Sequence, residues 1–462
     1  MAEFGGPDLC ALSAVAVQNL LKTREISPED LLTASQTRVE QTEPKQNALV
    51  TQCYKRAFER IRPDTLLGGI PMGVKDLTDV AGVRTTYGTL GYKDHIPQAS
   101  DPLVLAMEAN GALVVGKTNT PEMGAGANTF NEVFGPTGNP HNLALNAGGS
   151  SGGAASGLAT GQVWLSHGSD YGGSLRTPAA YCNVVGLRPS PGRAGGSGTV
   201  FDTLGVQGPM ARSVADCALF LDAMQGADAG PISYPAPDIS FLSAVQSAPE
   251  QVRIGYMPDL CGHAPVEAEV SDLLAYALKQ AAQAGCVVDE VNLDTAGMDQ
   301  AFRAIRALGF ASSNLSLPDE ITRHFKPTIK GNAADAEALR AHDLAAANLT
   351  RAQLYRDATV LLGSFDVLAC PVVGLAPLPR EVEFPPMVKG VASRDYLDWL
   401  GFSNLSTLTS LPALSLPVGR MAGGMPMGIQ LIGPNRGEAK LLAAARALER
   451  ILGINTNPVD LP

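Results

Sequence analysis

The sequence predicts an α/β protein built on a large central β-sheet. Two observations favour this class. Short apolar runs of strand length recur along most of the chain, and stretches with helical periodicity alternate with them. In addition, hydrophobic residues make up 45% and charged residues 17% of the 462 residues, a composition that supplies a sizeable buried core. A chain of this length can fold as one unit, and we expect a single domain over 1–462.

The first part of the chain, 1–65, is predicted to be a helical segment packed on the rest. Amphipathic patterns over 12–24 and 28–42 indicate two helices. The second begins with Ser27-Pro28-Glu29-Asp30, which places a capping residue, a proline at the first helical position and two acids in the first turn.

The region 66–225 shows the α/β pattern and is expected to hold the catalytic core. Gly69–Asp76 has the pattern of a strand that runs into a loop. The elements that follow are a helix over 101–110, a strand over 112–115, a helical run over 154–159, a strand over 163–165 and a helix over 214–224. We interpret 139–147, which lies between the strand over 112–115 and the helical run over 154–159, as a polar, proline-containing turn.

The region 226–400 is expected to vary and to shape the substrate site. Residues 226–250 are rich in Pro, Gly, Ala and Ser and are predicted to connect two subregions. Strand, helix and strand are predicted over 252–256, 266–284 and 286–291, and irregular stretches at 315–335 and 374–394 flank a helix over 336–362. Beyond it we expect strands over 413–418 and 428–432 and a closing helix over 438–451.

Composition excludes several classes of function. A net charge of −11 argues against nucleic acid or an anionic membrane as a partner. No run approaches the ~18 apolar residues that span a bilayer, and the first residues lack the pattern of a signal peptide. Seven scattered cysteines without a CxxC pair indicate reduced thiols of a cytoplasmic protein, and six scattered histidines give no metal-ligand spacing. We therefore expect no metal and no cofactor.

Two glycine–serine clusters, Gly148–Gly153 and Tyr171–Ser174, are the most informative stretch. Such runs are often flexible linkers. Here, however, they bracket the most apolar part of the chain, which a linker would not do. Successive backbone N–H groups in glycine-rich turns form a concavity that binds negative charge. A serine at its end has donors beside its hydroxyl, and this arrangement suits a nucleophile that attacks a carbonyl.

Several motifs in order resemble those of the amidase signature family. Lys75 stands at the end of a strand, the GGSSGG cluster follows, and Asp170–Ala179 fits the element D-x-GGS-x-R-x-P-A. Ser174 lies 24 residues after Ser150 and 99 after Lys75, as that family's pattern requires. Further matching motifs are Gly186–Ser190, Gln207–Arg212 and Met425–Gly433. The resemblance covers most of the chain and implies a large mixed sheet flanked by helices on both sides.

The resemblance implies a Ser–Ser–Lys triad. Ser174 would form an acyl-enzyme, Ser150, after a cis Gly149–Ser150 peptide, would shuttle the proton, and Lys75 would be the base. Gly124 would lie on a substrate-facing loop, and Ser151 would support the site. The residues expected to supply N–H groups to an oxyanion hole are Tyr171, Gly172, Gly173 and Ser174, with Tyr171 in place of the smaller residue that is usual there.

The residue chemistry agrees with these roles. A serine hydroxyl is a poor nucleophile until a base takes its proton. Lysine can act as that base only when neutral, so burial must lower the pKa of Lys75 well below ~10.4. Asp170 and Arg176 are predicted to form an ion pair that holds the loop, although a solvated surface pair is the alternative.

Other hypotheses about the function remain open. Gly149–Gly153 also satisfies G-x-S-x-G, the nucleophile elbow of α/β-hydrolases, with Ser151 as nucleophile, but that motif needs a strand immediately before it. The chain could instead be the glutamine-amidase subunit of a tRNA-dependent amidotransferase complex, which would work with partner chains. A third reading is an inactive binding protein on the same scaffold, which the filled triad positions disfavour.

The function that we predict is metal-free hydrolysis of the C–N acyl bond of neutral small-molecule amides, extending to carbamates as in a urethanase, by a monomer or homodimer. Glu122–Phe130 is small and apolar, without a cation, and none stands beside Tyr171 in the sequence. An anionic substrate would need one. Loops over 123–134, 315–335 and 374–402 are expected to set selectivity. The alternative is that cations there bind an anion: Arg323, Lys326, Arg380 and Arg394.

Overall fold

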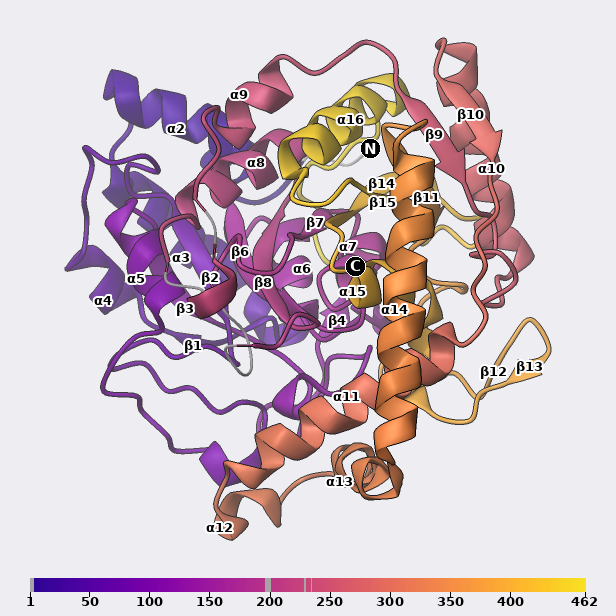
Figure 1. Ribbon diagram of the computed structural model, residues 1–462. Helices are drawn as coiled ribbons and strands as arrows, with labels where there is room; N and C mark the ends of the chain where they lie inside the picture. The colour runs from indigo at the N-terminus through magenta and orange to yellow at the C-terminus, as the bar shows by residue number, and fades with distance from the viewer. Residues whose placement is uncertain (1–3, 196–200, 228–229, 234) are drawn as a thin grey trace.

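The computed structural model describes residues 4–195, 201–227, 230–233 and 235–462. The described residues form a mixed sheet of 11 strands in the order β1-β3-β2-β6-β8-β7-β14-β15-β11-β9-β10, which runs through the middle of the molecule with helices packed around it (Figure 1). The predicted α/β class with a large mixed sheet is confirmed. The strands are β1 (Leu49–Gln52), β2 (Pro71–Lys75), β3 (Leu113–Thr118), β6 (Leu165–Asp170), β7 (Val185–Arg188), β8 (Val206–Ala211), β9 (Arg253–Tyr256), β10 (Val287–Glu290), β11 (Val367–Pro371), β14 (Ala413–Arg420) and β15 (Pro426–Ile432).

The sheet has parallel pairs toward its two ends and antiparallel pairs in the middle, and its edge pair β1–β3 is also antiparallel. β2 pairs in parallel with both β3 and β6, and β9 pairs in parallel with β10 and β11. The pairs β6–β8, β8–β7, β7–β14, β14–β15 and β15–β11 are antiparallel. The strands that bear the sequence motifs are buried on both faces, except at Ser169 of β6, which is half-buried.

The N-terminal helices follow the predicted pattern. They are α1 (Asp8–Ala11), α2 (Ala14–Thr23) and α3 (Pro28–Gln46), and α4 (Tyr54–Phe58) follows them. Ser27 and Asp30 form a reciprocal capping box at the start of α3, in which Ser27 Oγ accepts from the N–H of Asp30 and Asp30 Oδ2 accepts from the N–H of Ser27. The local sequence signal therefore marks the start of this helix.

The helices between strands form two packed groups around the sheet. One consists of α6 (Gly152–Ala159) and α7 (Arg176–Cys182), which pack on each other and on the central strands. The other is built around α8 (Val214–Ala223) and α16 (Glu438–Leu452), which contact each other. Both contact α9 (Phe241–Gln246), and α16 also contacts α10 (Ala268–Gln283). Short helical elements elsewhere are α5 (Pro102–Ala109), η1 (Leu90–Tyr92), η2 (Glu122–Gly124) and η3 (Gly230–Ile232). The main core runs from Cys10 near the start to Leu448 near the end.

Two segments before β9 differ from the sequence-based predictions. The stretch 139–147 is not a turn but a hairpin of β4 (Gly138–Asn139) and β5 (Asn142–Asn146). A distant segment stabilises it, because the N–H of Asn146 donates to the carbonyl of Leu378 and the N–H of Arg380 donates to that of Ala144. The predicted connection over 226–250 contains η3 and α9, and its residues 228–229 and 234 lie outside the described part.

The region after β10 is more helical than predicted. It contains the 18-residue α11 (Met298–Leu315), for which no helix was predicted, and the short helices α12 (Asp319–Thr322) and α13 (Pro327–Ala334) where an irregular stretch was expected. Figure 1 shows α11 crossing the lower part of the molecule beside the long α14 (Ala341–Leu362). The remaining elements are η4 (Asp335–Ala338), β12 (Met387–Val388), β13 (Val391–Ala392), η5 (Tyr396–Ser403) and α15 (Asn404–Thr409).

Candidate active site

The candidate site lies where β2 and β6 end. These two strands are parallel neighbours, so their carboxyl ends meet at the same edge of the sheet. Lys75 is the last residue of β2, and Asp170 is the last of β6. The loop Tyr171–Ser174 joins β6 to α7, and Ser150 and Ser151 come immediately before α6. The topology therefore brings together the residues that the sequence motifs singled out.

Lys75 is buried among three serine hydroxyls. Its Nζ lies 2.6 Å from Oγ of Ser150, 2.9 Å from Oγ of Ser151 and 3.1 Å from Oγ of Ser169, and 3.4 Å from the carbonyl oxygen of Ser169. Among the described residues it forms no ion pair with a carboxylate, and its side chain has no exposed surface. Ser169 was not singled out in the sequence, because a lone serine inside a strand carries no motif.

Burial lowers the pKa of Lys75 to about 7, while the negative charge of Asp170 acts in the opposite sense. The neutral amine has two N–H donors and one lone pair. With hydroxyls on several sides, that lone pair can accept a proton from Ser150, which is the closest. The neutral form of Lys75 is thus populated near neutral pH.

Ser150 and Ser174 face the same cavity. Its volume is about 360 Å³, and Gly124 and Tyr171 also line it. The Gly149–Ser150 peptide is cis. Gly124 has a φ of +71°, and a Cβ there would lie 3.6 Å from Oγ of Ser150 and 2.8 Å from Leu77. A side chain at this position would therefore fill the space next to Ser150.

Ser151 has a different position from Ser150. It is fully buried, does not line the cavity, and its Oγ contacts Lys75 and the carbonyl of Ser169. Its N–H donates to the carbonyl of Ser174. A nucleophile elbow would have to present Ser151 to substrate, so that interpretation of the GGSSGG cluster is wrong. Ser151 is placed to orient Lys75.

The loop before α7 offers backbone donors to the cavity. Gly173 has a φ of +96°, which turns the chain sharply before Ser174. Its N–H donates to Oδ1 of Asp170 at 2.9 Å in this structure, and the expectation that Gly173 supplies an oxyanion donor stays a prediction. The N–H groups of Tyr171, Gly172 and Ser174 have no acceptor among the described residues and remain available.

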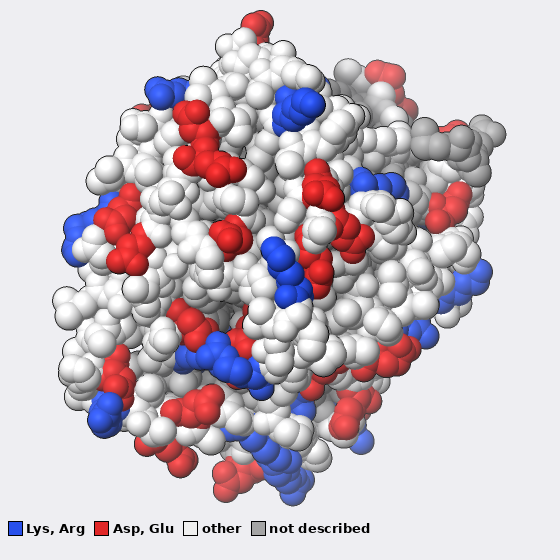
Figure 2. Space-filling model, turned by 90° about the vertical axis from the view of Figure 1, so that its right-hand side faces the viewer, with Lys and Arg blue, Asp and Glu red and all other residues white. Residues whose placement is uncertain are grey.

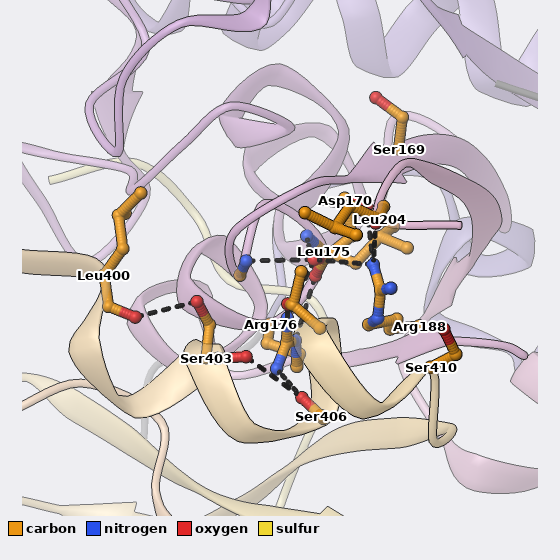
Figure 3. A network of polar contacts seen from close by, with 12 residues as sticks. Ser169, Asp170, Leu175, Arg176, Arg188, Leu204, Leu400, Ser403, Ser406 and Ser410 are labelled. Carbon is orange, nitrogen blue, oxygen red and sulfur yellow. Dashed lines mark hydrogen bonds and ion pairs between the residues drawn. The ribbon is translucent and has the colours of Figure 1, made fainter. Parts of the chain in front are cut away.

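A buried ionic network stands behind this loop (Figure 3). Nε and Nη2 of Arg176 donate to the two carboxylate oxygens of Asp170 at 2.9 and 2.8 Å, and Nη1 of Arg188 approaches Oδ1 at 3.4 Å. The N–H of Leu175 also donates to Asp170. Arg176 and Asp170 are 1% exposed. The surface-pair alternative is therefore wrong, and the predicted pair is a core element.

These contacts keep Asp170 ionised. Burial alone would raise the pKa of this carboxyl, but the charges and hydrogen bonds of Arg176, followed by Arg188 and the N–H of Gly173, hold it well below its usual range. Arg176 also donates to Oγ of Ser406 at 2.6 Å and contacts Gln430, which ties the loop to α15 and β15. The second arginine was not assigned this role from the sequence, although it lies in one of the matched motifs.

The cavity wall comes largely from segments that the sequence left unassigned. Residues 201–205 and 305–314 contribute much of it, whereas 315–335 contributes Ile329 and 374–402 contributes no lining residue. Arg306, on α11, lies with its guanidinium carbon 5.2 Å from the Tyr171 ring centre. The premise that no cation stands beside Tyr171 is therefore wrong, since α11 brings one there from 135 positions further along the chain.

The four cations that the sequence offered as alternative anion binders do not line this cavity. Lys326 pairs with Glu383, Arg380 with Glu381, and Arg394 with Asp299 and Asp398. Of the four, Arg323 alone has no such pair within the described ranges. Of the loops predicted to set selectivity, 123–134 and 315–335 contribute residues to the cavity wall, and 374–402 does not.

The described part of the chain contains no cluster of three or more His, Cys, Asp or Glu side chains arranged to hold a metal ion. Within the same residues, no helix is both long and apolar enough to cross a membrane. Figure 2 shows one face of the molecule on which acidic and basic side chains are interspersed, without an extended basic surface.

The fold and the site define the class of protein, and comparisons with known proteins agree with it. A family model described as Amidase matches residues 30–442. An acylamidase from Rhodococcus erythropolis is 32% identical, with 95% of each chain covered. A glutamyl-tRNA(Gln) amidotransferase subunit from Moorella thermoacetica is also 32% identical, over 96% of this chain and 97% of that one.

Among solved structures, a bacterial aryl acylamidase of the amidase signature family superposes with a TM-score of 0.87 at 28% identity, over 95% of this chain and 96% of that one. The class is therefore that of amidohydrolases, which act on carbon–nitrogen bonds other than peptide bonds. The chain belongs to the amidase signature family.

Proposed function

We propose that this chain hydrolyses the C–N acyl bond of small amides, and of carbamates, through an acyl-enzyme on Ser174. The observation that carries the proposal is the position of Lys75. It is buried, has no carboxylate partner among the described residues, and lies 2.6 Å from Ser150, which shares one cavity with Ser174. A lysine that only stabilised the fold would gain more from an ion pair.

The proposed reaction moves one proton along this line of residues. Neutral Lys75 accepts the proton of Ser150, and Ser150 accepts that of Ser174 as Oγ of Ser174 bonds to the substrate carbonyl carbon. Backbone N–H groups of the Tyr171–Ser174 loop stabilise the negative oxygen of the tetrahedral intermediate. The proton then returns through Ser150 to the leaving nitrogen, the C–N bond breaks, and water cleaves the acyl-enzyme by the same route.

The cavity next to Ser174 fits an acyl group that is apolar close to the scissile bond. Leu77, Met123 and Ile305 line it, together with Phe310. A carbamate differs from an amide by one ether oxygen on the acyl carbon, so the same nucleophile and donors can serve both. We therefore propose that the substrate is uncharged around the scissile bond, whereas the sequence predicted a substrate that is neutral as a whole.

A second candidate function is supported by the comparisons. Several relatives at about the same identity as the acylamidase are subunits of glutamyl-tRNA(Gln) amidotransferases. In that case the chain would release ammonia from glutamine within a complex. The two candidates differ in a simple assay: the amide hydrolase cleaves an anilide as an isolated chain, whereas the amidotransferase component would require glutamine and its partner chains.

The acyl-enzyme is tested by labelling the nucleophile. A fluorophosphonate should label the purified protein on Ser174, identified by peptide mass spectrometry, and the label should be absent from a Ser174→Ala control. Labelling of Ser151 in the wild-type protein would overturn the assignment. Hydrolysis of an acyl 4-nitroanilide by the wild-type protein, with none by Ser174→Ala, completes the test.

A further inference from the structure

One charged side chain in the cavity is not used by the proposed mechanism. Arg306 lies on the inner face of α11, is 3% exposed and lines the cavity next to Tyr171. Its guanidinium carbon lies 4.5 Å from the ring centre of Phe310, 5.5 Å from that of Tyr396 and 5.9 Å from that of Phe302. Aromatic faces attract a cation, so these rings hold the guanidinium at the cavity wall.

The hydrogen-bonding capacity of Arg306 is largely unused. Its Nη2 donates to Oη of Tyr396 at 2.7 Å, whereas its Nε is buried without any partner. No carboxylate pairs with it among the described residues, in contrast to Arg176 and Arg188, which both face Asp170. A buried guanidinium normally faces a carboxylate or another acceptor, because an unpaired buried charge is unfavourable. The missing partner can come from the substrate.

A second donor stands beside it. The hydroxyl of Tyr171 has no hydrogen-bond partner among the described residues, and burial raises the pKa of this phenol, so it keeps its proton. Space for the hydroxyl depends on Gly309, where a Cβ would lie 2.5 Å from Oη of Tyr171. The glycine on α11 and the tyrosine on the nucleophile loop thus fit each other, with Arg306 one turn earlier on the same helix.

The position of these donors sets the length of the ligand. Tyr171 precedes Ser174 by three residues, so their Cα atoms are at most about 11 Å apart. Tyr171 and Arg306 line the same cavity of about 360 Å³ as Ser174, so a group held by them is joined to the scissile carbonyl by a chain short enough to fit within this cavity. Of the other charged side chains on the cavity wall, Asp170 is bound by Arg176 and Arg188, and the opposite charges of Asp202 and Arg351 attract each other. Among the described residues of the wall, Arg306 is then the charge without a counter-charge.

We propose that Arg306 and Tyr171 form a subsite for a carboxylate carried at the far end of the substrate's acyl chain. The substrate class is then the half-amide of a short dicarboxylic acid, or a carbamate with a comparable acid group. This inference rests on the proposed amide hydrolysis at Ser174. It replaces the sequence-based preference for a fully neutral substrate, while the group around the scissile bond stays uncharged.

The test compares two substrates of equal length, glutaryl 4-nitroanilide and its methyl ester, at pH 8. The wild-type kcat/KM should be about tenfold to a hundredfold higher for the acid, as expected for hydrogen bonds between charged groups. Arg306→Met should bring this ratio close to one, mainly through KM, and Tyr171→Phe should lower it in part. Arg303→Met is the matched control, because it lies on the same helix, pairs with Asp299, Asp395 and Asp398, and should leave the ratio unchanged.

A higher wild-type kcat/KM for the ester than for the acid would overturn the subsite. So would an Arg306→Met variant whose kcat/KM falls by the same factor for the acid and the ester, because a purely structural role of Arg306 gives that result. Binding separates this question from catalysis. In calorimetry with the Ser174→Ala protein, the acid should bind at least about tenfold more tightly than the ester. Equal binding refutes the subsite whether or not the chain hydrolyses amides, whereas tight binding of the acid without wild-type turnover refutes the proposed function alone.

Discussion

The buried base makes a prediction about stability as well as rate. The ordinary pKa of a lysine is 10.5, and burial lowers the pKa of Lys75 to about 7 in the folded protein. Each pKa unit corresponds to about 1.4 kcal/mol, so below pH 7 the burial of its charge costs about 5 kcal/mol. Above pH 7 the folded protein binds fewer protons at this site than the unfolded chain, and the free energy of unfolding therefore rises with pH until about 10.5.

The informative variant is Lys75→Met, which has a similar length and no charge. It loses the contacts of Nζ with the three hydroxyls, which are worth about 1 kcal/mol each. At pH 7 the variant should still be more stable than the wild type, by about 2 kcal/mol, since removal of the buried charge outweighs these contacts. Its activity should be lost.

The pH dependence isolates the titration of Lys75 from the lost contacts, which do not change with pH. Between pH 7 and pH 9 the wild type should gain about 2 kcal/mol of unfolding free energy relative to Lys75→Met, measured by equilibrium urea unfolding. The wild-type kcat/KM for a neutral anilide should fall with decreasing pH through about 7, as the amine becomes charged. Parallel stability curves for the two proteins would refute the neutral-lysine argument.

Three further substitutions probe the surroundings of the site. Asp170→Asn leaves two buried guanidinium groups without an anion and should destabilise the protein by about 3–5 kcal/mol, read as a lower thermal midpoint. Arg188→Met leaves the Asp170 charge less compensated, which favours charged Lys75, so the acidic limb of the rate profile should move upward by roughly half a pH unit. Gly309→Ala should displace the Tyr171 phenol and reduce the preference for the acid substrate, measured as the kcat/KM ratio of acid to ester, without changing the labelling of the nucleophile.

Much of the fold and the centre of the site follow from local sequence signals. The start of α3 is fixed by a capping box within four residues, and β2 is an apolar run that ends in Lys75. The glycines of the two clusters predict sharp turns, and the structure has them at Gly148 and Gly173, both with positive φ. Such features depend on neighbours along the chain, and for that reason they can be recognised without the tertiary structure.

The wall of the cavity depends on contacts between distant segments. α11 has an amphipathic pattern, with Met298, Ala301 and Phe302 buried, so its helical character was present in the sequence but was missed. That Arg306 would face Tyr171 could not be predicted, because the contact depends on how α11 is placed across the edge of the sheet. The same holds for Ser169 and Arg188, whose partners lie on other strands.

The ionic network and the buried Lys75 are best understood together. Lys75 and Asp170 end neighbouring parallel strands, and the carboxylate charge favours protonation of the amine. A carboxylate left alone beside a buried lysine would form an ion pair with it and keep it charged, so it could not act as a base. Here the charge of Asp170 is balanced by Arg176 and Arg188 instead. The network thus holds the nucleophile loop in place and at the same time leaves Lys75 free to be neutral, and both effects require that the two arginines bind the same carboxylate.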